Sequence, residues 1–148
     1  MLFRSELDGK SVQAIPGESI LQAAKRSGVE IPHLCFKEGM RADGNCRACV
    51  VEIEGERVLA PSCCRAPTAG MQVLAQSERA IKSQKMILEM LLSDMPEQGY
   101  KWNEDDAKLP HGELSEWAGR MQVSVRSELK ALRREQPVSD VSDRKSVV

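Results

Sequence analysis

This sequence of 148 residues has few aromatic residues, few histidines and no large excess of either charge. These features exclude several classes of protein. Aromatic side chains make up 3% of the chain, so its core has to be aliphatic. Lys and Arg number 21 against 22 Asp and Glu, which is not the basic excess of a nucleic-acid-binding surface. No apolar run approaches the ~20 residues that span a bilayer, and no signal-peptide core opens the chain. We therefore expect a soluble, cytoplasmic protein with no membrane span and no nucleic-acid partner.

Catalytic motifs are also missing. The sequence contains no Gly-x-Gly-x-x-Gly, no phosphate-binding P-loop and no set of residues arranged for acid–base or nucleophilic catalysis. We expect no catalytic site in this chain alone, which leaves open whether it forms part of an enzyme.

Cysteine is absent from most of the chain, because all five cysteines lie between residues 35 and 64. A disulfide framework would spread them through a secreted chain and favour an even number, whereas crowding indicates a single metal site. Four of them follow the pattern Cys35-x10-Cys46-x2-Cys49-x13-Cys63. A 2Fe–2S cluster needs four thiolates, two on each iron. The pattern therefore predicts a 2Fe–2S cluster bound by Cys35, Cys46, Cys49 and Cys63.

The loop before Cys46 suits such a cluster. Gly39 and Gly44 permit positive φ, and backbone N–H groups aimed at the sulfurs would stabilise their negative charge. The rival site is a zinc ion bound by four cysteines. Such sites usually pair two short Cys-x2–4-Cys knuckles, and only Cys46 and Cys49 form a short pair here.

Three further residues could belong to the site. Cys64 could replace Cys63 as a ligand, but adjacent residues of an extended chain point in different directions, so we interpret Cys64 as a small packed residue. His33 could tune the cluster or replace a ligand, although four cysteines already fill the site. His111 is interpreted as a surface residue at a helix start.

Hydrophobic alternation and turn signals predict a small sheet in the first part of the chain. Residues 2–7 and 12–15 form strands joined by the hairpin turn Asp8-Gly9. Ser19 precedes a short helix that closes near Gly28. Further strands are expected over residues 49–53, 57–60 and 71–75, the first two joined around Glu54-Gly55. The order β-β-α-β-β-β predicts an α+β fold of the β-grasp type.

The rest of the chain is predicted to be helical. Ser77 is positioned to cap a helix that runs through Leu92 and ends before Pro96, and shorter helices are expected over residues 113–120 and 126–135. Residues 136–148 have only isolated valines as apolar residues and are predicted to be disordered. We therefore divide the chain into a 2Fe–2S domain (1–76), a helical extension (77–135) and a tail (136–148).

These motifs together carry a family resemblance. Gly-Asn-Cys-Arg-Ala-Cys-Val-Val-Glu-Ile-Glu-Gly (44–55) and Ala-Pro-Ser-Cys-Cys (60–64) resemble the N-terminal 2Fe–2S domain of the large iron–sulfur subunit of complex I. They resemble the same domain of the alpha subunit of NAD-dependent formate dehydrogenase more closely still. The likeness continues through residues 91–96, 111–117 and 129–137. It implies the same four cysteine ligands, a β-grasp fold, and partners that carry 4Fe–4S, molybdopterin and flavin/NAD groups.

The sequence departs from this family after the first domain. Many relatives continue with a histidine and three cysteines that bind a 4Fe–4S cluster, and residues 65–148 contain no cysteine. The resemblance implies that the chain relays single electrons as a module or fragment of a formate dehydrogenase or a related complex I-like oxidoreductase. Two alternatives remain: a free-standing ferredoxin shuttle, which would need no helical extension, and a zinc-stabilised interaction domain.

Overall fold

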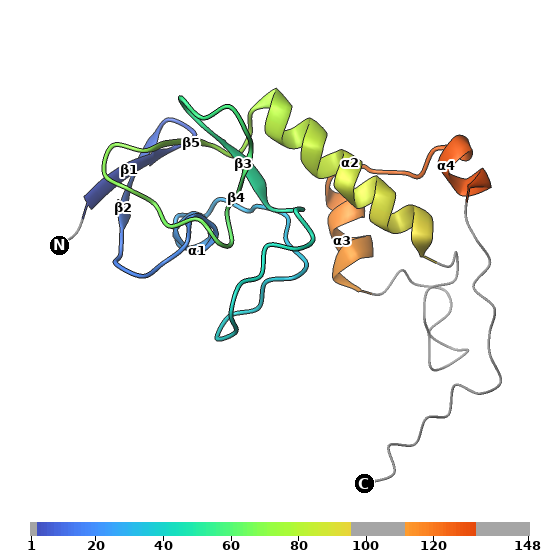
Figure 1. The fold of residues 1–148 in the computed structure, drawn as a ribbon, viewed down its shortest axis with the longest axis horizontal. Helices are drawn as coiled ribbons and strands as arrows, with labels where there is room; N and C mark the ends of the chain where they lie inside the picture. The colour runs from blue at the N-terminus through green and yellow to red at the C-terminus, as the bar shows by residue number, and fades with distance from the viewer. Residues whose placement is uncertain (1–2, 96–111, 133–148) are drawn as a thin grey trace, which may run out of the picture.

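The computed structural model describes residues 3–95 and 112–132. Its elements follow one another as a strand-rich half and then a helical half, which lie at opposite ends of the molecule in Figure 1. In chain order they are β1 (Phe3–Leu7), β2 (Lys10–Ala14), α1 (Ile20–Arg26), β3 (Val50–Ile53), β4 (Ala60–Pro61), β5 (Gln72–Leu74), α2 (Glu78–Asp94), α3 (Glu113–Arg120) and α4 (Ser127–Ala131).

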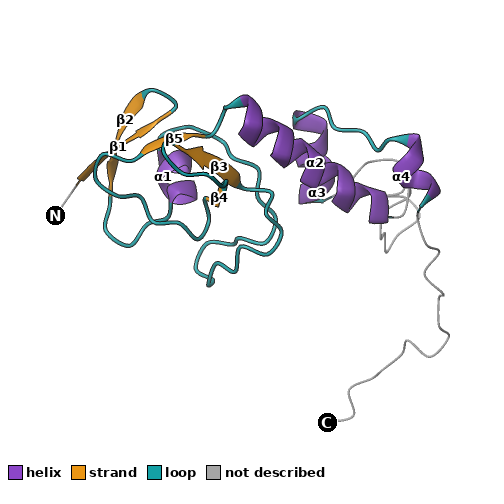
Figure 2. Cartoon of the chain, turned by 45° about the horizontal axis from the view of Figure 1, so that its top comes forward, coloured by secondary structure: helices purple, strands orange, loops and turns teal. Residues whose placement is uncertain are grey.

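The strands form one five-stranded mixed sheet in the order β2-β1-β5-β3-β4. The central pair, β1 and β5, is parallel, and all other neighbours are antiparallel. Asp8 and Gly9 both adopt positive φ, +48° and +78°, as a tight hairpin between right-twisted strands requires. With α1 lying across the sheet (Figure 2), this is the β-grasp arrangement that the sequence predicted.

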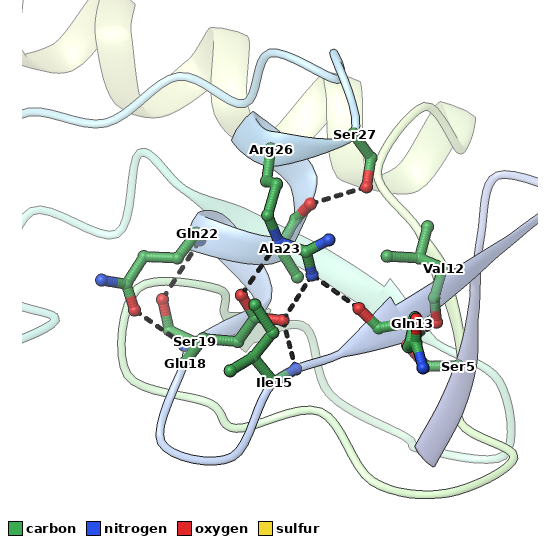
Figure 3. Close-up of polar contacts among 10 residues, drawn as sticks. All are labelled: Ser5, Val12, Gln13, Ile15, Glu18, Ser19, Gln22, Ala23, Arg26 and Ser27. Carbon is green, nitrogen blue, oxygen red and sulfur yellow. Dashed lines mark hydrogen bonds and ion pairs between the residues drawn. The ribbon is translucent and has the colours of Figure 1, made fainter. Parts of the chain in front are cut away.

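Helix α1 forms because its first turn is capped on both sides. The Ser19 hydroxyl accepts from the backbone N–H of Gln22, and the Gln22 side chain accepts from the N–H of Ser19. Arg26 then ties the helix to β2: its Nη2 donates to the carbonyl of Gln13 at 2.6 Å and to Glu18 at 2.7 Å (Figure 3). The inner face of α1, which includes Ile20, packs with the sheet in one aliphatic core.

Strand β4 differs from the sequence prediction. We expected a strand over residues 57–60, and the structure has one only at Ala60–Pro61. The turn at Gly55 is present, with φ +82°. In the segment before β4, the carbonyl of Arg57 accepts from Arg79, and that of Leu59 accepts from Arg47. The pairing with β3 ends at Ala60, and Val58 is 66% exposed.

The helices following the sheet are where the sequence placed them. Ser77 caps α2 by accepting from the N–H of Ala80. Helix α2 packs against β3 and against α3. Helix α4 ends at Ala131, so it is confirmed only in its first turns. The predictions for His111 and for the tail 136–148 lie outside the described residues.

One negative finding concerns membranes. Within residues 3–95 and 112–132, none of the helices is both long and apolar enough to cross a bilayer.

Candidate metal centre

The four predicted ligands lie on three segments that the sheet holds together. Cys49 directly precedes β3, and Cys63 follows β4 by two residues. Because Val50 pairs with Pro61 in the antiparallel β3–β4 ladder, these two cysteines come to the same end of the sheet. They are 1% and 2% exposed. Cys35 and Cys46 lie in the long loop between α1 and β3 and are half-buried.

The candidate ligands lie next to one another. The side chains of Cys35 and Cys46 interact with each other, and that of Cys63 interacts with those of both Cys49 and Cys64. A 2Fe–2S cluster requires two thiolates on each of two irons, so two pairs are the arrangement it needs. Among the described residues, no three His, Cys, Asp or Glu side chains converge as a site for one ion would require. Four thiols on adjacent segments are the donor set that a 2Fe–2S cluster takes, so the residues present fit this group.

Backbone N–H groups of the ligand loop are directed at the sulfurs of the first pair. The amides of Ala48, Cys35 and Leu34 hydrogen-bond to the Cys46 sulfur and lower the pKa of this thiol, although its burial acts in the opposite direction. For Cys35, burial raises the pKa of the thiol, and the amides of Cys46 and Asn45 partly offset this. Amides so placed stabilise negative charge on sulfur, as the sequence predicted.

The second pair is more deeply buried than the first. Burial raises the pKa of the Cys63 thiol well above its ordinary range, and the adjacent Cys49 side chain raises it further. The carbonyl of Cys49 accepts two hydrogen bonds from Ser62, one from the hydroxyl at 2.7 Å and one from the amide at 3.1 Å. Ser62 is fully buried. Nothing in the sequence indicates this role of Ser62 except its position between a proline and a predicted ligand.

Gly44 shapes the loop at its closest approach to the thiols. It is buried, with φ +65°, and a Cβ placed on it would lie 2.9 Å from the Cys64 sulfur. Gly39 also has positive φ, +83°, but open space lies around it. Both glycines therefore have the conformation that the sequence predicted, and only Gly44 also needs its lack of a side chain.

The interpretation of Cys64 as a small packed residue is wrong, because the residue is exposed. The chain after Pro61 is a turn, in which the amides of Cys64 and Arg65 both donate to the Pro61 carbonyl. The alternation of an extended chain therefore does not apply. The Cys64 sulfur lies 3.5 Å from that of Cys63, next to the candidate ligand set.

His33 is enclosed by aromatic rings. Its Nδ1 is 2.8 Å from the carbonyl oxygen of Ile31. Its ring lies 6.2 Å from that of Phe36, edge to face, and 5.8 Å from that of Trp117 in α3. Sequence reasoning missed the contact with Trp117, since the residues are far apart along the chain and nothing local marks them as partners.

A β-grasp sheet that presents two pairs of thiols at one end defines a ferredoxin-like iron–sulfur domain. Comparison with known families agrees: residues 3–78 match the 2Fe-2S iron-sulfur cluster binding domain, and the chain belongs to that family. Its cofactor is therefore a 2Fe–2S cluster, and its chemistry is one-electron transfer.

Related proteins belong to large oxidoreductases. The chain is 42% identical over 95 residues to the NADP-reducing hydrogenase subunit HndD of Solidesulfovibrio fructosivorans, covering 61% of this chain and 16% of that protein. It is 40% identical over 90 residues to the mitochondrial NADH-ubiquinone oxidoreductase 78 kDa subunit of Candida albicans, covering 61% and 12%. The matched part thus spans a sixth or less of these relatives.

The fold is also similar to that of a solved structure. A crystal structure of an NAD+-reducing NiFe-hydrogenase in the H2-reduced state matches with a TM-score of 0.67 and 29% sequence identity. The match covers 83% of this chain and 50% of the other. It extends beyond the 2Fe–2S domain, since residues 3–78 are only about half of the chain. The expected family, that of the complex I large iron–sulfur subunit, is confirmed.

Proposed function

We propose that Cys35 and Cys46 bind one iron of the 2Fe–2S cluster and that Cys49 and Cys63 bind the other. The observation that carries this assignment is the β3–β4 ladder, which brings Cys49 and Cys63 to one end of the sheet. The contact between the side chains of Cys35 and Cys46 also supports it, since each iron takes two thiolates. When bound, the cluster accepts and releases one electron at a time. Cys64 is not a ligand in this assignment, although its sulfur is close enough to require a direct test.

The protein around the thiols has two tasks. The amides directed at Cys46 stabilise its thiolate form, which is the form that binds iron. The burial of Cys49 and Cys63 keeps water from the second pair, whereas Cys35 and Cys46 remain partly exposed. Electrons would therefore enter and leave on the side of the first pair, where partner proteins can approach.

The parent assembly is a second, separate part of the proposal. The relatives are subunits of hydrogenases and of NADH-ubiquinone and NADH-quinone oxidoreductases. We propose that this chain relays electrons as a module of an assembly of this kind in the cytoplasm, with 4Fe–4S, molybdopterin and flavin/NAD modules as partners. The resemblance of residues 91–96, 111–117 and 129–137 to the formate dehydrogenase alpha subunit supports formate dehydrogenase as the parent enzyme.

The ligand assignment is tested by single replacements in protein reconstituted anaerobically with iron and sulfide. The wild-type protein should be red-brown and contain about two irons and two sulfides per chain. Cys46→Ser and Cys49→Ser should lose the cluster, and Cys64→Ser is the matched control that should keep it. If Cys64→Ser bleaches the protein while Cys63→Ser does not, the fourth ligand is Cys64. A colourless protein that holds one zinc ion would refute the cluster itself.

The parent enzyme is tested by purifying the native protein under anaerobic conditions and identifying the proteins that accompany it. The preparation is then supplied with formate, NADH or hydrogen, and reduction of the 2Fe–2S cluster is followed by electron paramagnetic resonance. Reduction by formate supports the proposal. Reduction only by hydrogen or NADH assigns the chain to a hydrogenase or an NADH dehydrogenase, and a chain that purifies alone would indicate a ferredoxin shuttle.

A further inference from the structure

Helix α2 reaches the segment that carries Cys49. Gln84, only 2% exposed, donates from its Nε2 to the carbonyl of Val50 at 2.8 Å. This carbonyl lies beyond the paired part of β3 and β5, whose register ends at Glu52 and Leu74. A buried carbonyl without a donor is costly, so Gln84 replaces the missing strand partner. Val50 directly follows Cys49, and the contact therefore fixes the backbone beside that ligand.

Helix α3 reaches the segment that carries Cys35. The Trp117 ring lies 5.8 Å from the ring of His33, tilted by 57°. Arg120 stacks on the same indole at 5.1 Å and bridges to Glu30 at 3.0 Å. These contacts hold both ends of the stretch from residue 30 to residue 33, which leads directly into Cys35.

The two contacts come from one packed unit, because α3 lies against α2. In Figure 1, α3 lies alongside α2, next to the ligand-bearing loop. Movement of the unit would therefore reach both thiol pairs, one through Gln84 and the other through Trp117.

We infer that the helical extension positions the cluster ligands, with Gln84 and Trp117 as the positioning residues. The inference rests on the proposed ligand assignment. Gln84 fixes the side of Cys49 and Cys63, and Trp117 fixes the side of Cys35 and Cys46. Neither residue binds iron. Trp117 packs on His33, two residues before Cys35, and solvent access is one of the factors that set the potential of an iron–sulfur cluster.

The test uses the full reconstituted protein and four variants. Trp117→Ala removes the ring contact, and Trp117→Phe keeps a ring on His33. Gln84→Leu removes the hydrogen bond to Val50 at nearly constant volume. Arg126→Gln is the matched control, because it breaks the bridge from Arg126 to Glu89 in α2 at 2.7 Å and so loosens the helices away from both ligand segments.

Two readouts separate positioning from general stability: the midpoint potential of the cluster and the amide exchange of each ligand segment. Trp117→Ala should shift the potential in the positive direction, because added water stabilises the extra negative charge of the reduced cluster. It should speed exchange of amides 31–36 by about 2- to 13-fold, the factor expected for one aromatic contact. Gln84→Leu should speed exchange around residues 49–51 instead. Trp117→Phe should restore the wild-type values, and Arg126→Gln should retain them.

Several results would overturn the inference. One is a wild-type potential and wild-type exchange in both Trp117→Ala and Gln84→Leu. Another is an equal change in Arg126→Gln, since that would reflect loosening of the helices in general. Failure of the ligand assignment is distinguishable, because the wild-type protein would then bind no 2Fe–2S cluster or would lose it on replacement of Cys64.

Discussion

Replacement of Gly44 by alanine should weaken cluster retention for two separable reasons. The first is conformational: Gly44 has φ +65°, and an L-residue in the left-handed region costs roughly 1–2 kcal/mol. The second is steric, because the new Cβ would lie 2.9 Å from the Cys64 sulfur. Forcing extra atoms into a packed site costs about 1–3 kcal/mol. We therefore expect a total penalty of about 2–5 kcal/mol for Gly44→Ala.

Gly39→Ala isolates the first cost, since Gly39 has φ +83° and no atom within 4 Å of the added Cβ. Comparison of Gly44→Ala with the double variant Gly44→Ala/Cys64→Ala isolates the second cost, because the double variant lacks the obstructing sulfur. If the two costs add, this double variant should behave like Gly39→Ala, and both should retain the cluster better than Gly44→Ala. Cys64→Ala alone should be close to the wild type.

The assay is the rate at which a chelator bleaches the visible absorption of the reconstituted protein. A penalty of one to two kcal/mol corresponds to a factor of about 5–30 in the equilibrium between the intact and the opened loop. Gly39→Ala should therefore bleach about 5- to 30-fold faster than the wild type where opening precedes iron loss. If the double variant bleaches as fast as Gly44→Ala, the Cys64 sulfur is not the obstacle and the steric argument fails.

Three further predictions concern the frame around the site. Asp8→Gly should lower the unfolding free energy measured in urea by about 1–3 kcal/mol, because the Asp8 Oδ1 accepts from the amides of Ala75 and Gln76. Asp8→Asn should retain most of the stability, since its side-chain oxygen can accept the same bonds. Arg126 holds the pKa of the Glu89 carboxyl below its ordinary value. The bridge should therefore stabilise the α2–α4 contact at neutral pH, and this stabilisation should disappear as the pH falls through the pKa of Glu89 in the folded protein. The amide protection of residues 127–131, corrected for the intrinsic pH dependence of exchange, would show no change at descending pH if the bridge has no role. Removal of the cluster should raise amide exchange in residues 35–49 far more than in α2, and equal protection with and without cluster would contradict metal-dependent ordering of the loop.

Local signals were sufficient for most of the fold. The Asp8-Gly9 turn, the Ser19 and Ser77 caps and the alternation of apolar residues all lie within a few residues of the element that they specify. Helix α3, at Glu113–Arg120, lies where the sequence predicted a short helix. Strand β4 was misplaced, since it begins only at Ala60 and the exposed segment before it bonds to side chains from elsewhere, Arg47 and Arg79.

The candidate ligands were also accessible to sequence reasoning, because their spacing alone restricts the metal site. Their pairing and their supports were not. Cys64 was misjudged, since nothing in its neighbours shows that the chain turns after Pro61. Trp117 and Gln84 reach the ligand segments across large separations in sequence, and a helix stripe does not reveal which loop it will contact.

The support from α2 bears on where the chain can be divided. A boundary after Gln76 follows the change from strands to helices, and it remains our prediction for the domain limits. A chain ending there would nevertheless leave the Val50 carbonyl without its donor and uncover the face of β3 that α2 packs against. Loss of electron transfer in such a truncated chain would therefore not identify α2 as a docking surface. Replacement of Met86 and Met90, which are 47% and 58% exposed on α2, tests docking while leaving Gln84 in place.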